Sequence, residues 1–244
     1  MGAVVAERDT DADWRELGAT QPYWGVLTHP QFRTENLTSA TVESFYASGG
    51  EHIAYVVAGL ERATGARPSG RALDFGCGAG RLTEAMTAYV VEVTGYDISP
   101  GMLDKARQRG GRAGYVGELP AGPFDWINSF IVFQHIPPAR GMVLLEALLA
   151  RLAPGGLVSL HLTIWREPHL KPAAPAGWRR FAGPLIALRR KLRPQAPGAI
   201  MMYDYDLSAV VEACNRAGIA DLTLVATDHG GHHGAIVLGR KAQA

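Results

Sequence analysis

A histidine-rich segment near the C-terminal end of the chain contains side chains that could do chemistry. The segment TDHGGHHG (227–234) brings Asp228, His229, His232 and His233 close together, separated by glycines. Imidazoles and carboxylates are common zinc ligands, and an imidazole is also a common general base near neutral pH. A flexible hairpin with incidental histidines would give the same pattern. We expect no bound metal here, because the glycines leave the loop too loose to hold ligands rigidly.

A second candidate site is a glycine-rich loop in the first half of the chain. In LDFGCGAGR (73–81), Gly76, Gly78 and Gly80 lie between a strand-like and a helix-like segment. Glycines permit positive φ and let a ligand approach the backbone at a helix N-terminus. Their GxGxG spacing differs by one residue from the GxGxxG of dinucleotide-binding loops. Asp97 ends the next strand-like segment and could accept hydrogen bonds from ribose hydroxyls, so the two features together predict an adenosine-containing ligand.

The elements that must position these residues alternate along the chain from residue 71 onward. Strands are expected over 71–76, 90–97, 113–118, 124–130, 157–165, 221–228 and 234–241. Helices are expected over RLTEAMTAYV, SPGMLDKARQRG (with Ser99 as its cap), ARGMVLLEALLARLA (stopped by the following PGG) and DLSAVVEACNRAG. This alternation predicts an α/β fold with a mainly parallel seven-stranded sheet, ending in an antiparallel hairpin. The connection from 118 to 124 is too short for a helix, but as an extended loop it could pass two intervening strands.

Four segments resemble the class I S-adenosylmethionine-dependent methyltransferases: LDFGCGAGRLT, VTGYDISPGMLDKAR, FDWINSFIVFQHIP and LLARLAPGGLVSLHL. They cover about residues 71–165 in the order that the family has. The resemblance implies a Rossmann-like fold with an α-rich cap, S-adenosylmethionine as the cofactor, and methyl transfer as the activity. On the methionine side of the cofactor it implies Asp74, Gly76, Cys77, Gly78, Gly80, Ser129 and Phe130. On the adenosine side it implies Asp97 at the ribose, Ile98 against adenine, and Glu118, where the family commonly has Asp, near the adenine amino group.

The resemblance also suggests which residues act on the acceptor. Methyl transfer needs an aligned acceptor, and a hydroxyl acceptor benefits from a general base. His135 and Gln134 follow the fourth expected strand, where the family often has a His-His pair, so they are a candidate base and a candidate acceptor-orienting residue. His135 could equally brace its loop. The sixth expected strand is parallel to the others, so its following turn lies on the same rim, and His229 and His232 are further candidate bases.

The remainder of the chain suggests a division into four parts. These are an N-terminal helical lid (1–68), a cofactor-binding core (69–165), a basic substrate-cap insertion (166–205), and a C-terminal helix and hairpin that complete the core (206–244). The aromatic lid candidates are Tyr23, Trp24, Phe45 and Tyr46. Residues 166–193 contain eight Arg or Lys and one acidic residue. This composition fits an anionic acceptor or a solvated basic helix.

Composition excludes several classes of function. The chain has 244 residues, 47% of them hydrophobic, and a formal net charge of +1. This charge gives no general attraction to nucleic acid or membrane, and no apolar run approaches the ~20 residues of a membrane span. We therefore expect a cytoplasmic enzyme that methylates a small molecule, with a sugar or natural-product hydroxyl as the favoured acceptor. The alternatives are an N-methyltransferase that works by proximity, a nicotinamide-dependent oxidoreductase, and a non-catalytic binding protein.

Overall fold

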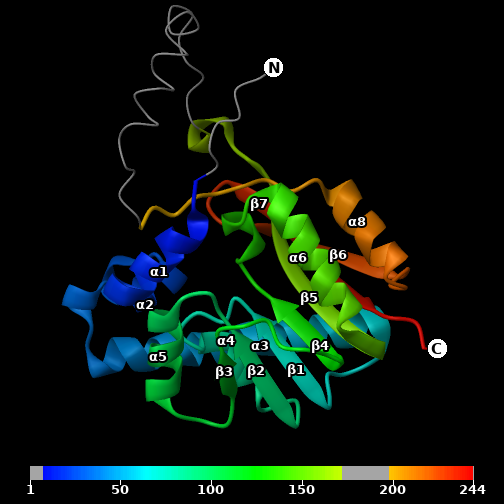
Figure 1. Cartoon of the computed structure of the whole chain (residues 1–244), viewed down its shortest axis with the longest axis horizontal. Coiled ribbons are helices and arrows are strands. Elements are labelled where there is room, and N and C mark those ends of the chain that lie inside the picture. Colours follow the sequence, from blue (N-terminus) through cyan, green and yellow to red (C-terminus); the bar gives the residue numbers. More distant parts are fainter. Residues whose placement is uncertain (1–7, 172–197, 244) are drawn as a thin grey trace, which may run out of the picture.

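A computed structural model describes residues 8–171 and 198–243 of the chain. In this part of the chain, seven strands form one sheet in the order β3-β2-β1-β4-β5-β7-β6 (Figure 1). The strands are β1 (Arg71–Phe75), β2 (Glu92–Tyr96), β3 (Gly114–Val116), β4 (Phe124–Ser129), β5 (Leu152–Arg166), β6 (Leu222–Asp228) and β7 (His232–Arg240). β7 is antiparallel to both β5 and β6, and the other pairs are parallel. The predicted mainly parallel sheet with a terminal antiparallel hairpin is confirmed.

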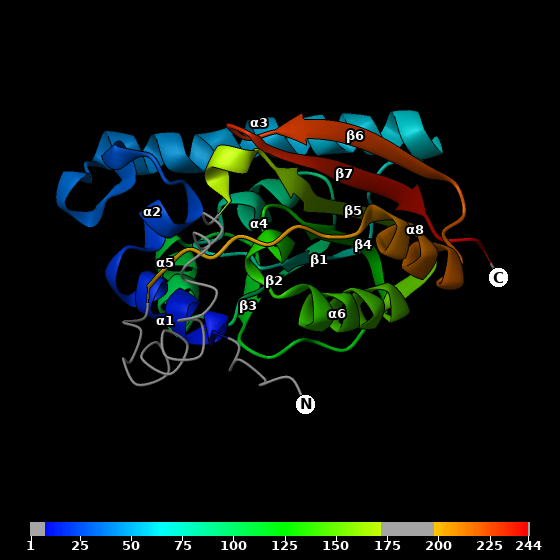
Figure 2. The same ribbon diagram turned by 90° about the horizontal axis from the view of Figure 1, so that it is seen from above.

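Helices cover both faces of this sheet. α3 and α4 pack on one face, and α6 and α8 pack on the other (Figure 2). The α-helices are α1 (Thr10–Thr20), α2 (Pro22–Val26), α3 (Ser39–Thr64), α4 (Arg81–Met86), α5 (Pro100–Arg109), α6 (Pro138–Ala150) and α8 (Leu207–Arg216). Short 3-10 helices span η1 (Pro30–Phe32), η2 (Thr34–Asn36), η3 (Phe133–His135) and η4 (Pro168–Leu170).

The central strand β1 shows how the core divides between the two faces. Ala72 belongs to the buried cluster beneath α3, whereas its neighbour Leu73 belongs to the cluster beneath α6 and α8. Successive side chains of a strand point to opposite faces, so a strand covered on both sides has an uninterrupted apolar run. The connection from β3 to β4 crosses β2 and β1 without a helix, as the short segment between 118 and 124 predicted.

Some predicted boundaries are wrong. α4 ends at Met86 and not at Val90, and β5 begins at Leu152, five residues earlier than predicted. The PGG sequence does not merely stop a helix, because Pro154–Gly156 lies inside an irregular start of β5 that is opposite β4. The N–H of Gly155 donates to the carbonyls of Lys241 and Ala242, at 3.1 and 3.3 Å, so a distant part of the chain draws this segment into the sheet.

The side-chain cap predicted for α5 is not formed, although Ser99 occupies the predicted position. Ser99 lies at the N-cap position and Pro100 opens the helix, but the Ser99 hydroxyl makes no capping hydrogen bond. Its Oγ atom is buried and has no hydrogen-bond partner in the part of the chain that the structure describes. The backbone N–H of Ser99 instead donates to Asp97 Oδ1 at 2.9 Å.

The predicted lid aromatics form a cluster around Phe45, a fully buried residue of α3. Tyr23 and Tyr46 approach its ring edge-on at 5.0 and 5.2 Å. The hydroxyl of Tyr46 donates to the carbonyl of Ala79 in the glycine loop at 3.1 Å. These aromatics therefore attach the N-terminal part of the chain to the glycine loop.

Most of the predicted basic cap, including residues 172–193, lies outside the described residues. Its two described ends meet each other, because Arg166 Nε and Asp204 Oδ1 form an ion pair at 2.6 Å. Lys171 Nζ lies 3.7 Å from the second oxygen of the same carboxylate. The described segments before and after the insertion therefore lie side by side at the end of β5.

Candidate functional site

The glycine loop turns sharply between β1 and α4. The N–H groups of Gly76 and Cys77 donate to the carbonyl of Tyr96 at 2.8 and 2.9 Å, which ties the loop to the end of β2. Gly76, Gly78 and Gly80 all have positive φ. A Cβ atom at Gly76 would meet the side chain of Val132. The loop therefore depends on glycine for both its backbone shape and its close packing.

Asp97 lies beside this loop at the carboxyl end of β2. The N–H of Gly78 donates to its Oδ2 atom at 2.8 Å, and the N–H of Ser99 donates to Oδ1 at 2.9 Å. Each oxygen of an ionised carboxylate can accept a further hydrogen bond. Burial raises the pKa of Asp97 to about 6, although these backbone hydrogen bonds oppose the increase. The structure thus brings the predicted loop and the predicted carboxylate together.

A cavity of about 290 Å³ opens along the loop. Its wall includes seven of the residues predicted to bind the cofactor: Asp74, Gly76, Cys77, Gly78, Asp97, Ile98 and Phe130. The N-terminal part of the chain contributes Thr10, Asp11, Trp14, Gly25 and Val26. Three further predicted residues are not part of this wall. Gly80 forms the N-cap of α4, Ser129 is fully buried in β4, and Glu118 is exposed after β3.

Several buried polar atoms at or beside this cavity have no hydrogen-bond partner within the described residues. Thr10 Oγ1 and Arg81 Nε belong to residues of the wall, and Ser99 Oγ and Ser129 Oγ lie next to wall residues. Buried polar atoms in proteins are nearly always hydrogen-bonded, so this group fits a polar ligand. Cys77 is fully buried between glycines, and burial raises the pKa of its thiol well above its ordinary value. A thiol of this kind is a packing group and not a nucleophile.

His135 belongs to η3 and lines the cavity. Its Nδ1 atom lies 2.8 Å from the carbonyl of Met201, and since a carbonyl only accepts, Nδ1 carries the proton. The Nε2 atom then accepts from the Gln134 amide at 3.2 Å, and Gln134 Oε1 accepts from the Thr163 hydroxyl at 2.7 Å. The ring packs against Trp14 at 4.9 Å, and burial lowers the pKa of His135 to about 4. Both ring nitrogens are thus engaged within the protein, which is the arrangement expected of a brace.

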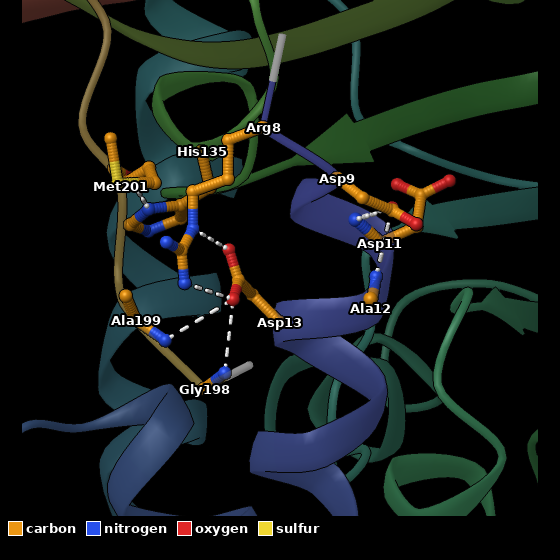
Figure 3. A network of polar contacts seen from close by, with 9 residues as sticks. All are labelled: Arg8, Asp9, Asp11, Ala12, Asp13, His135, Gly198, Ala199 and Met201. Carbon is orange, nitrogen blue, oxygen red and sulfur yellow. Dashed lines mark hydrogen bonds and ion pairs between the residues drawn. The ribbon is translucent and has the colours of Figure 1, made fainter. Parts of the chain in front are cut away.

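The segment that returns from the insertion is fastened to α1 by a network around Asp13 (Figure 3). Asp13 accepts from Arg8 Nε and Nη2, both at 2.6 Å, and from the N–H groups of Gly198 and Ala199 at 2.9 and 3.3 Å. Burial alone would raise the pKa of Asp13, but these hydrogen bonds lower it. The same segment supplies the carbonyl that holds His135, so hydrogen bonds connect α1, the returning segment and η3.

The histidine-rich hairpin is tighter than predicted. Its loop contains only residues 229–231, and His232 and His233 already belong to β7. The N–H of Gly231 donates to Asp228 Oδ1 at 2.8 Å and closes the turn. His233 stacks on Trp165 with the ring centroids 4.2 Å apart. None of His229, His232 and His233 is part of the described cavity wall.

His229 is the hairpin histidine that lies beside a residue of the cavity wall. Its ring approaches Phe130 edge-on at 6.3 Å and His161 at 5.1 Å. Burial lowers the pKa of His229, so the ring is neutral near pH 7. His161 and His52 of α3 also approach the Phe130 ring, at 5.0 and 5.4 Å. Phe130 thus stands among three imidazoles.

Sequence reasoning missed three residues here: His52, Arg81 and His161. His161 is 1% exposed on β5, and its Nε2 atom lies 2.9 Å from Thr227 Oγ1, while Nδ1 has no partner among the described residues. A histidine inside the apolar segment LVSLHLTIW was a readable signal for it. Arg81 could have been noticed because it directly follows the last glycine of the loop. His52 has no distinguishing pattern.

Within residues 8–171 and 198–243, no three side chains of His, Cys, Asp or Glu are grouped so that they could hold a metal ion. None of the helices described there combines the length and apolar character needed to span a membrane.

Comparison with known proteins gives a consistent family. Residues 50–199, more than half of the chain, match the family model described as "Methyltransferase domain". The chain is similar to a ubiquinone biosynthesis O-methyltransferase of Xanthomonas campestris pv. campestris, with 33% identity over 114 residues, 42% of this chain and 46% of that protein. A Bordetella avium protein of the same name is 33% identical over 120 residues, 45% of this chain and 48% of that protein. The matched segments span less than half the length of these relatives.

Solved structures share the fold at low sequence identity. The magnesium protoporphyrin IX methyltransferase of Synechocystis PCC 6803 with bound SAM has a TM-score of 0.62 and 17% identity, covering 97% of this chain and 99% of that one. An amino pentose methyltransferase of Micromonospora echinaspora has a TM-score of 0.55 and 21% identity, covering 84% and 99%. These likenesses show a common architecture.

Proposed function

The chain belongs to the methyltransferase domain family, as the sequence resemblance predicted, and we propose that it methylates a hydroxyl group of a small molecule. S-adenosylmethionine, when bound, supplies a methyl group on a sulfonium that the acceptor displaces in line. The observation that carries the proposal is the glycine loop beside Asp97, on the wall of a cavity with unpartnered buried polar atoms. Family membership argues against the nicotinamide-dependent alternative.

The cofactor-binding residues follow from this arrangement. Asp97 keeps acceptor capacity for ribose hydroxyls, and Ile98 offers an apolar surface beside it. The loop from Gly76 to Gly78 admits close approach to its backbone, and Phe130 supplies part of the wall beyond β4. Glu118 remains a weaker prediction, because it is exposed and outside the cavity wall.

His229 is the proposed general base. It is neutral near pH 7, its ring is exposed, and it lies against Phe130 at the cavity wall. His135 has both ring nitrogens engaged, and its pKa of about 4 makes it a weak base, so its contacts favour the bracing role. The named activity of the ubiquinone biosynthesis relatives supports oxygen as the acceptor atom.

We propose an anionic acceptor on the basis of charge. Residues 166–193, which follow β5, contain eight Arg or Lys and one acidic residue. Neutralising Arg189, Arg190 and Lys191 should raise KM for a carboxylate-bearing acceptor and reduce its salt dependence. An unchanged KM at low salt would return this stretch to the solvated-helix interpretation.

The main experiment follows the transfer of a labelled methyl group from S-adenosylmethionine to a panel of phenols, sugars and matched amines. We expect label on hydroxyl acceptors, undiminished by a metal chelator. His229→Ala should lower kcat by roughly 10²–10⁴ with the S-adenosylhomocysteine affinity retained. His29→Ala, an exposed histidine outside the cavity wall, is the control. Label found only on amines, or activity that a divalent ion restores after chelation, would overturn the proposal.

A further inference from the structure

Arg81 carries a positive charge into the protein interior at the cavity wall. Its side chain is 4% exposed and belongs to the first turn of α4, directly after the glycine loop. No ion pair in the described part of the chain includes it. Asp74 is the acid whose charge acts on Arg81, but its oxygens accept from Thr83 Oγ1 at 2.7 Å and Asn128 Nδ2 at 2.9 Å. A buried guanidinium with no direct ion pair is costly, so this site favours an anionic ligand.

The contacts of the guanidinium hold it in place without neutralising it. Nη1 lies 2.8 Å from His52 Nδ1 and 3.2 Å from Ser48 Oγ, both on α3. Arginine only donates, so His52 Nδ1 accepts from it with the imidazole neutral, and burial and the charge of Arg81 lower the pKa of His52 accordingly. Nδ1 then cannot also donate to the Ser48 carbonyl 3.1 Å away. Nε is buried and has no partner within the described residues. One of the three guanidinium nitrogens is therefore held by α3, and Nε could donate to a ligand.

The other arginine of the cavity wall is different. Arg140 is ion-paired with Asp11 at 2.5 Å and is partly exposed to solvent. Asp97 supplies the carboxylate that the proposed function assigns to ribose hydroxyls. Arg81 is thus the cavity cation that is both buried and without an acidic partner in residues 8–171 and 198–243.

We propose that Arg81 binds the α-carboxylate of the methionine part of S-adenosylmethionine. The inference rests on the family membership and the proposed cofactor site. A guanidinium and a carboxylate have matching planar geometries and form strong charge-assisted hydrogen bonds. His52 and Ser48 are the positioning residues, because they contact Arg81 and fix the direction of its fork.

The test compares two ligands by calorimetry. S-adenosylhomocysteine contains the amino-acid carboxylate, and 5′-methylthioadenosine has the same adenosine and thioether without the amino-acid group. Arg81→Met should weaken S-adenosylhomocysteine on the order of 10- to 100-fold and leave 5′-methylthioadenosine unchanged. Arg81→Lys keeps the charge but not the forked geometry of the guanidinium. Its affinity for S-adenosylhomocysteine should lie between those of the wild type and Arg81→Met. Equal losses for both ligands, or no loss for either, would overturn the proposal.

Two controls separate ligand binding from folding. Arg140→Met removes a cation from the same wall, and any effect it has should be the same for both ligands. If Arg81→Met fails to fold, the wild type and Arg81→Lys still test the proposal. The wild type must bind S-adenosylhomocysteine more tightly than 5′-methylthioadenosine, and Arg81→Lys must reduce that difference. Failure of wild type to bind S-adenosylhomocysteine would overturn the cofactor assignment itself, whereas binding without any dependence on Arg81 would overturn this inference alone.

Discussion

Asp97 combines two properties that make cofactor affinity depend on pH. Its carboxylate must be ionised to accept ribose hydroxyls, and burial raises its pKa to about 6. Below pH 6 the free protein binds a proton there, which ligand binding must release. The affinity for S-adenosylhomocysteine should therefore be constant above about pH 7 and fall by up to roughly tenfold per pH unit below 6.

Calorimetry between pH 5 and 8 measures this dependence directly. Asp97→Asn is the matched variant, since it keeps the shape but cannot titrate. It should bind S-adenosylhomocysteine more weakly by about 2–3 kcal/mol at pH 7.5 and lose the pH dependence. A wild-type affinity that does not change across this range would contradict the role of Asp97.

His135 and His229 can be separated by stability as well as by kinetics. His135→Ala leaves the buried carbonyl of Met201 and the Gln134 amide without their partner, so it should lower the free energy of unfolding by about 1–3 kcal/mol. His229 is exposed on a turn, and its replacement by Ala should change that free energy by less than about 0.5 kcal/mol. Urea unfolding of both variants checks this. A large loss for His229→Ala would indicate that its ring is structural.

Two adjacent glycines of α3 give a matched pair of substitutions at the scale of elements. A Cβ atom at Gly49 would collide with the backbone carbonyl of Arg81, whereas one at Gly50 would meet nothing within 4 Å. Gly50→Ala should stabilise the helix by about 0.5–1 kcal/mol, since alanine is the better helix former. Gly49→Ala should instead destabilise the protein by about 1–3 kcal/mol, because α3 and the start of α4 must move apart.

Thermal or urea unfolding of the two variants distinguishes packing from helix propensity. Equal stabilisation by both alanines would show that α3 does not pack closely on the glycine loop. A selective loss for Gly49→Ala would place the constraint at Arg81, where the two elements meet.

The attachment of α1 to the returning segment depends on a single carboxylate. Asp13→Asn removes the charge that Arg8 pairs with, and should lower the free energy of unfolding by about 1–3 kcal/mol at pH 7. Because the pKa of Asp13 is lowered from its ordinary value of 3.8, its contribution is complete above that value and is lost as the pH falls below it. The difference between wild type and Asp13→Asn should thus shrink in acid, as urea unfolding at pH 7 and pH 3 can measure. A difference independent of pH would contradict an ionic attachment.

The order of these elements was predictable because it rests on local patterns. Apolar runs such as the one in β1 identify buried strands, and the short segment between 118 and 124 excluded a helix. Boundaries failed where distant segments decide them. Gly155 joins β5 because the carbonyls of Lys241 and Ala242 accept its N–H, and no local pattern near Gly155 reports that contact.

At the scale of the whole molecule, one part of the candidate site could be predicted from the sequence and another part could not. The meeting of the glycine loop with Asp97 was predictable, because parallel strands bring their carboxyl ends to one edge of the sheet. The contributions of Trp14 and Arg81 to the cavity were not predicted. Trp14 reaches the wall because α1 packs against α5, and the burial of Arg81 depends on its contacts with α3.

The cavity is built from segments that are far apart in the sequence, and this should make ligand binding a property of the whole molecule. Its wall joins residues of α1 and α2 to the loops after β1, β2 and β4. A ligand that contacts all of them links the N-terminal helices to the core. At 100 times its dissociation constant, S-adenosylhomocysteine should raise the stability by about 2.7 kcal/mol.

The distribution of this stabilisation can be measured by hydrogen exchange with and without S-adenosylhomocysteine. α1 should gain the most protection, because Thr10, Asp11 and Trp14 line the cavity and a bound ligand would add contacts to this helix directly. α8 packs against α6 and contributes no residue to the described cavity wall. Its protection should therefore increase only as far as the ligand suppresses global unfolding. Equal protection of α1 and α8 would mean that α1 opens only with the whole fold. No added protection of α1 would mean that it does not contribute to the ligand site.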